Sequence, residues 1–170
     1  LTVKKATPAI TWSNPPSIAY GVALGTAQLN ATANVQGSFA YSPSGGTVVN
    51  AGTQTLSVAF TPNDTANYNT TTATVTLNVQ KLTPIVSWSS PSPITYPTPL
   101  GPVQLNATAN VPGAFSYSPG NGNVIAAGTL DLSATFTPND PVNYNTASAA
   151  VTITVFKSDQ SISFATIGDR

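Results

Sequence analysis

The chain has 170 residues, of which only 6% are charged, and its five cationic and five anionic side chains cancel to a net charge of zero. It contains no run of lysine or arginine that could neutralise a row of phosphates, so we expect no nucleic-acid partner. No apolar stretch approaches the roughly 20 residues that cross a bilayer, so we expect no membrane insertion within this segment.

The amino-acid types that the chain lacks restrict the class of protein further. Cysteine, methionine and histidine are absent, so the chain offers no disulfide framework and no Cys/His metal cluster. Glutamate is absent too, and helices usually carry glutamate and lysine on their exposed faces. The fifteen prolines and twelve glycines favour short strands separated by frequent turns.

At the N-terminus, residues 1–5 (LTVKK) match residues 77–81 (LNVQK). We therefore expect residues 1–5 to be the end of a preceding repeat. The first complete repeat is predicted to span residues 6–81.

Within this repeat the apolar residues alternate, which is the period of a β-strand. Each run ends near a breaker, namely Gly37, Pro43, Gly52 or Pro62. About seven short strands in one repeat predict a sandwich of two sheets, with aromatic side chains supplying much of the core. In chain order the runs are Ile10 to Trp12, Ile18 to Tyr20, Leu29 to Val35, Phe39 to Tyr41, Thr47 to Val49, Leu56 to Phe60 and Val75 to Val79. The core aromatics are Trp12, Phe39, Tyr41, Phe60 and Tyr68.

A second repeat, residues 82–157, aligns with residues 6–81 without a gap, and more than half of the positions are identical. Such self-similarity indicates duplication and a tandem array. Residues 158–170 are predicted to start a following repeat, because Ile162 and Phe164 fall where Val86 and Trp88 do. The matched landmarks include Trp12 with Trp88, the string QLNATANV from Gln28 and from Gln104, and the string TPND from Thr61 and from Thr137.

The joint between the two repeats, Val79 to Pro84, has almost no spare residues. Pro84 stiffens it further. This joint predicts that successive sandwiches are held in an extended arrangement.

The repeats resemble bacterial immunoglobulin-like modules that occur in long tandem series in secreted and surface proteins. The resemblance covers essentially the whole chain. It is carried by the ITW of Ile10 to Trp12, Tyr20-Gly21, the AGT segment from Ala51 and the closing TPNDTANYNT from Thr61, whereas the second repeat has Tyr96-Pro97 in place of Tyr-Gly. It implies two tandem immunoglobulin-like sandwiches in an all-β chain, with a non-catalytic role as spacer or adhesive unit.

One polar loop is a candidate calcium site. The segment NDTANYN from Asn63 recurs as NDPVNYN from Asn139 and concentrates side-chain oxygens. Each copy brings one carboxylate, Asp64 or Asp140, whereas good calcium loops bring several. The favoured interpretation is that these residues cap a turn and that the loop tyrosines close the end of the sandwich.

Three other features have a functional and a structural interpretation. Trp12 and Trp88 are either sugar-stacking platforms or core residues, and strand alternation favours the core. A lysine recurs at each joint, at Lys5, Lys81 and Lys157. An isopeptide crosslink from such a lysine would need a nearby carboxylic acid, and no aspartate lies close in sequence in both copies. The favoured interpretation is therefore a solvated lysine at a strand end. The Asn-x-Thr sequons at Asn30, Asn63, Asn69 and Asn106 are expected to be unused.

We expect no catalytic, cofactor-binding or metal-binding residues, because the five aspartates do not cluster and no motif positions a base beside a hydroxyl. The sequence favours a non-enzymatic spacer of an extracellular stalk, fibre or adhesin, secreted or at a cell surface, whose partners are neighbouring repeats. The alternatives are a module that binds a cell-surface glycan or protein, and a filament subunit that assembles by strand addition.

Overall fold

The computed structural model describes residues 2–164, and every regular element in that range is a β-strand. The expected following repeat, residues 158–170, therefore falls partly outside the described residues, as does Leu1 of the expected preceding one. The chain divides into two compact units. Unit 1 holds the residues up to Leu82 together with the segment Asp140–Asn145, and unit 2 holds Thr83–Asn139 and the residues from Thr146 onward.

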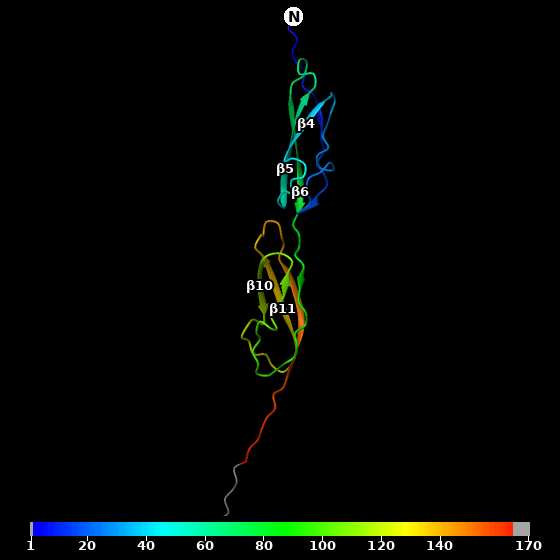
Figure 1. Ribbon diagram of the computed structural model, residues 1–170. Helices are drawn as coiled ribbons and strands as arrows, with labels where there is room; N and C mark the ends of the chain where they lie inside the picture. The colour runs from blue at the N-terminus through cyan, green and yellow to red at the C-terminus, as the bar shows by residue number, and fades with distance from the viewer. Residues whose placement is uncertain (1, 165–170) are drawn as a thin grey trace, which may run out of the picture. The chain divides into compact units, whose positions relative to one another are not determined.

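Unit 1 is built on a four-stranded sheet with the order β2-β6-β5-β4. The long strands β5 (Gly52–Pro62) and β6 (Thr71–Gln80) pair antiparallel, and β4 (Gly37–Ser42) pairs antiparallel with the other edge of β5. The short strand β2 (Ile18–Ala19) adds to β6 in parallel. Figure 1 shows β4, β5 and β6 running side by side.

The second layer of unit 1 is smaller and less regular. It contains the antiparallel pair β1 (Ile10–Thr11) and β3 (Thr32–Ala33). A single bridge between Ala23 and Val48 joins two of its loops.

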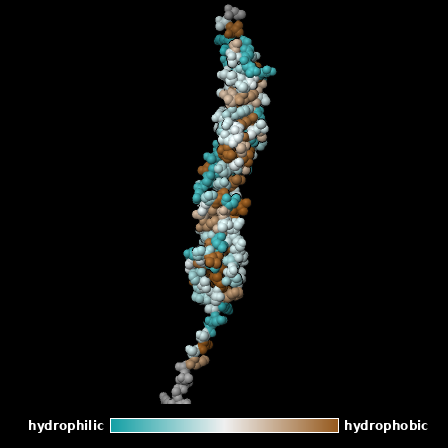
Figure 2. Space-filling model, viewed as in Figure 1, coloured by the Kyte–Doolittle hydropathy of each residue, from teal (hydrophilic) through white to brown (hydrophobic). Residues whose placement is uncertain are grey.

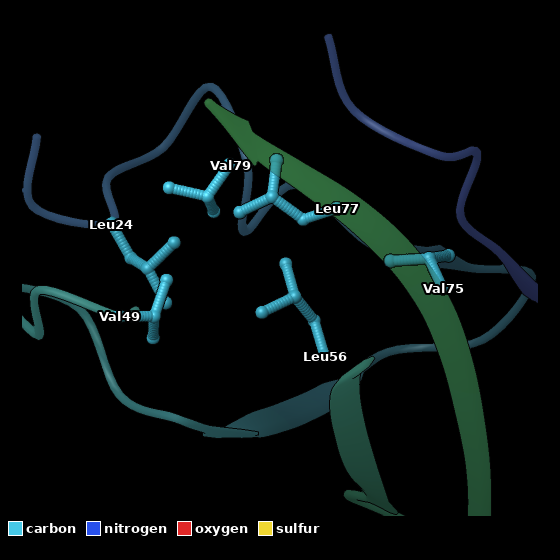
Figure 3. Packing of buried hydrophobic residues seen from close by; sticks show 6 residues of the cluster. All are labelled: Leu24, Val49, Leu56, Val75, Leu77 and Val79. Carbon is cyan, nitrogen blue, oxygen red and sulfur yellow. The ribbon is translucent and has the colours of Figure 1, made fainter. Parts of the chain in front are cut away.

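The core lies between these layers because strand alternation turns every second residue of the long strands inward. Leu56, Val58 and Phe60 on β5 are at most 1% exposed. Figure 3 shows how one cluster closes, with side chains from both layers pointing toward one another. Its members are Leu24, Val49, Leu56, Val75, Leu77 and Val79, and the partly buried Trp12, Tyr20 and Leu29 pack against it.

Unit 2 repeats this architecture. Its four-stranded sheet has the order β10-β11-β12-β8, formed by β10 (Gly113–Ser118), β11 (Gly128–Pro138), β12 (Ala147–Phe156) and β8 (Ile94–Thr95). The pair β7 (Val86–Ser87) and β9 (Thr108–Ala109) completes it. Its buried cluster contains Leu100, Leu105, Ile125, Leu132, Ile153 and Val155.

The predicted fold class, two tandem immunoglobulin-like β-sandwiches, is confirmed. Each repeat has six strands and two isolated bridges where about seven strands were expected. The run from Thr47 to Val49 gives only the bridge at Val48, and in the run from Leu29 to Val35 only Thr32–Ala33 is paired. Around Thr32–Ala33, hydrogen bonds to the Tyr41 hydroxyl and to the Asn34 side chain take the place of part of the ladder, as described below.

Candidate functional site: the polar loops shared by the two repeats

The loop that follows β5 is organised around the carboxylate of Asp64. Its Oδ1 accepts hydrogen bonds from the backbone N–H groups of Ala66 (3.2 Å) and Asn67 (3.1 Å). Its Oδ2 accepts one from Nδ2 of Asn67 at 2.8 Å. These hydrogen bonds, that of the Asn67 side chain foremost, lower the pKa of Asp64 from its ordinary value of 3.8. Both carboxylate oxygens are therefore engaged by the loop's own donors, as in an Asx-type turn.

The same loop is tied to the residues that enter the repeat. Backbone hydrogen bonds join Ala6 N–H to the Asn67 carbonyl (2.9 Å) and Asn69 N–H to the Ala6 carbonyl (2.8 Å). Nζ of Lys5 donates to the Thr65 carbonyl at 2.7 Å. The lysine at the joint thus holds a loop carbonyl, a use that the sequence did not reveal because it depends on a pairing between residues far apart in the chain.

Segment Asp140–Asn145 repeats these contacts. Oδ1 of Asp140 accepts from the N–H groups of Val142 and Asn143, both at 3.2 Å, and Oδ2 accepts from Nδ2 of Asn143 at 2.8 Å. Nζ of Lys81 donates to the Pro141 carbonyl at 2.6 Å. The two loops have the same local structure, and each is anchored by a lysine at the equivalent position.

Trp12 is partly buried and packs against the hydrophobic cluster of unit 1. Its indole N–H donates to the Gln28 carbonyl at 3.1 Å, and its ring meets Tyr41 edge-on with centroids 5.4 Å apart. The Tyr41 hydroxyl in turn accepts a hydrogen bond from the N–H of Ala31 at 2.9 Å. The same three contacts recur in unit 2, where they join Trp88, Gln104, Tyr117 and Ala107.

The repeated string QLNATANV supplies the polar groups of this network. Gln28 is only 8% exposed, and its Oε1 accepts from the N–H of Gly25 at 3.1 Å. Oδ1 of Asn34 accepts from the N–H of Ala9 at 2.9 Å. These bonds hold irregular segments where no strand ladder can. Recurrence of the string marked Gln28 and Asn34 as members of a repeated segment, but no local pattern predicted their individual hydrogen bonds.

The other features considered in the sequence are the sequons, metal-binding side chains and membrane-spanning segments. Asn30 and Asn106 are exposed, and both lie outside the strands. Among the described residues no group of three or more His, Cys, Asp or Glu side chains is placed to hold a metal ion. Within the same residues, no helix has the length and apolar character needed to cross a membrane.

No protein-family model matches the sequence, and no curated protein matches it. Solved structures with a similar arrangement include a Drosophila N-cadherin EC1-4 structure, with a TM-score of 0.40 and 12% identity over 91% of this chain. The chain spans 50% of that structure's length. The fibronectin(III)-like modules of Clostridium thermocellum CbhA match with a TM-score of 0.34 and 12% identity, over 94% of this chain and 100% of theirs.

Proposed function

We propose that the chain is a stretch of non-catalytic immunoglobulin-like repeats in an extracellular stalk, fibre or adhesin, in which each repeat acts as a spacer. The observation that carries this proposal is that the distinctive polar side chains of each repeat are used to hold the sandwich itself. The indole of Trp12, the amide of Gln28 and the carboxylate of Asp64 each make structural hydrogen bonds. The same bonds recur at Trp88, Gln104 and Asp140.

The surface supports the same proposal. Figure 2 shows residues of intermediate hydropathy over much of the visible face, with hydrophilic and hydrophobic residues scattered among them. Because only 6% of residues are charged and the net charge is zero, salt changes little in the electrostatic interactions of the chain. A spacer exposed to a varying external medium benefits from this weak dependence on salt. The resemblance of the sequence to bacterial immunoglobulin-like modules also supports this proposal.

A spacer must keep its repeats apart in solution, and small-angle X-ray scattering tests this requirement. The short joint at Val79 to Pro84 leads us to expect a maximum dimension on the order of 70 Å, from two sandwiches in line. A compact chain of this length would have a radius of gyration of about 15–16 Å. A compact value would contradict the spacer role and favour a binding module, because domains that pack side by side commonly build a site between them.

A matched control keeps both sandwiches and changes only the joint. Insertion of about ten glycine and serine residues between Lys81 and Leu82 makes a flexible linker. We expect this variant to give a broader distribution of distances than the natural chain. Indistinguishable distributions would mean that the natural joint hinges freely, which a spacer cannot do.

A further inference from the structure

The two Asp-Asn loops have the same sequence pattern but different surroundings. Asn67 is exposed, whereas Asn143 is only 5% exposed. Both make the same hydrogen bonds to their own aspartate, so the loop itself does not account for the difference. Asn143 must therefore be covered by residues from elsewhere in unit 1.

Asn50 and Ala51 contact Asn143 directly, and Tyr20 contacts the neighbouring Tyr144. Oδ1 of Asn143 accepts a hydrogen bond from the backbone N–H of Ala51 at 2.8 Å, and Nδ2 of Asn143 donates to Oδ1 of Asn50 at 3.3 Å. The rings of Tyr20 and Tyr144 meet edge-on with centroids 5.6 Å apart. Unit 1 thus contains a surface that receives an Asp-Asn loop through one backbone donor, one amide and one aromatic ring.

Unit 2 carries the equivalent surface without a loop upon it. The positions that repeat Ala51, Tyr20 and Lys81 are Ala127, Tyr96 and Lys157. Ala51 and Tyr20 are partly buried, whereas Ala127 is exposed and Tyr96 is 46% exposed. The backbone N–H of Ala127 donates no hydrogen bond to any of the described residues.

These residues also line a hollow in unit 2. The pocket has a volume of about 440 Å³, and its lining residues are Tyr96, Ala126, Ala127, Lys157, Ser158 and Gln160. It contains the backbone donor of Ala127, an exposed ring at Tyr96 and the lysine that corresponds to Lys81. The pocket therefore offers the same kinds of group that in unit 1 engage Asn143, Tyr144 and Pro141.

We propose that this pocket is a docking surface for the Asp-Asn loop of a further repeat of the same type joined after Lys157. In the docked state the side-chain oxygen of the loop's second asparagine accepts the Ala127 N–H. The loop tyrosine lies edge-on to Tyr96, and Nζ of Lys157 donates to a loop carbonyl. One contact is lost relative to unit 1, because Ala126 replaces the amide acceptor Asn50. This inference rests on the matched surfaces and not on the proposed spacer role.

Hydrogen exchange at single backbone amides tests the proposal. The reference measurement uses the chain as it is. We expect the Ala51 amide to exchange about tenfold or more slowly than the Ala127 amide, since only Ala51 has an acceptor. Asn143→Ala should remove that protection, whereas the matched control Asn67→Ala should leave it unchanged, because Asn67 is exposed.

The decisive measurement extends the chain. A copy of residues 82–157 is joined directly after Lys157, and its folding is checked by slow exchange at the appended positions that repeat Leu132 and Ile153. We expect the Ala127 amide to become about tenfold or more slower, and alanine at the appended asparagine that repeats Asn143 to reverse this change. A copy of residues 6–81 in place of residues 82–157 should give the same result, because its loop has the same asparagine and tyrosine.

Three outcomes would overturn the proposal. The first is an Ala127 amide that stays fast although the appended repeat is folded. The second is protection that persists when the appended asparagine is replaced by alanine. The third is protection that appears in the unextended chain as its concentration rises, because the occupant would then be a second copy of the chain and not a joined repeat. Failure in any of these ways leaves the scattering test of the spacer role unaffected.

Discussion

At the scale of single residues, the carboxylate of Asp64 decides how its loop responds to acid. The hydrogen bond from the Asn67 side chain is the main cause of its lowered pKa, with the backbone N–H groups of Asn67 and Ala66 and the charge of Lys5 acting in the same direction. A carboxyl group with a lowered folded-state pKa stabilises the fold above its unfolded pKa. That contribution is lost as the pH falls through the folded value.

We therefore expect Asp64→Ala to lower the melting temperature at neutral pH and the difference from the natural chain to shrink as the pH falls below 3.8. Thermal melting of both proteins from about pH 7 down to about pH 2.5 measures this. Asp64→Asn is the control, because it keeps an oxygen acceptor without a titrating charge. A difference that stays constant into the acid range would show that the carboxylate's ionisation does not stabilise the loop.

Single polar residues also mark the limit of what the sequence predicts. The turn role of Asp64 follows from local chemistry, since aspartate caps turns through its own loop. The burial of Gln28 and its bond to Gly25 belong to an irregular segment with no period to follow. Only the recurrence of the surrounding string indicated that these residues matter.

At the scale of elements, the start of β4 depends on a residue without a side chain. Gly37 faces Phe60 of β5, and a Cβ at Gly37 would collide with the Thr61 carbonyl oxygen and the Phe60 ring. Gly113 lies in the same way against Phe136 and Thr137 in unit 2. Both phenylalanines are at most 1% exposed, so their rings have little room to move.

Gly37→Ala should therefore destabilise its sandwich by about 1–3 kcal/mol, the usual cost of overpacking. For a domain of this size each kcal/mol lowers the melting temperature by about 4–8 °C. Gly25→Ala is a matched control, since a Cβ there meets nothing within 4 Å, and we expect it to change stability by less than about 1 kcal/mol. Equal effects of the two substitutions would mean that β4 and β5 can separate to admit a methyl group.

The strands themselves differed in how well they could be predicted. The runs Leu56 to Phe60 and Val75 to Val79 alternate strictly, and both lie within the long strands β5 and β6. The run Thr47 to Val49 has the same residue types but forms one bridge, between Val48 and Ala23, where Leu24 N–H donates to the Thr47 carbonyl. Alternation identifies an inward face, whereas pairing depends on which strand is available beside it.

At the scale of the whole molecule, repetition of sequence gives repetition of internal contacts but not of surroundings. The loops around Asp64 and Asp140 have nearly the same internal distances. Asn67 and Asn143 nevertheless differ in burial. No local pattern could predict that difference, because it depends on residues that are distant in the chain.

The same loops make a prediction about metal ions that concerns both repeats together. Each loop has one carboxylate, and both oxygens of Asp64 and of Asp140 already accept hydrogen bonds from their own loop. A calcium ion takes six to eight oxygen ligands, so binding would require these bonds to break without enough new ligands to replace them. We therefore expect the same melting temperature in millimolar calcium and in excess chelator. A shift of more than about 5 °C, which for a domain of this size is on the order of 1 kcal/mol, would contradict this prediction. Asp64→Ala and Asp140→Ala, measured separately, would then show which loop holds the ion, because only the substitution at the binding loop would abolish the shift.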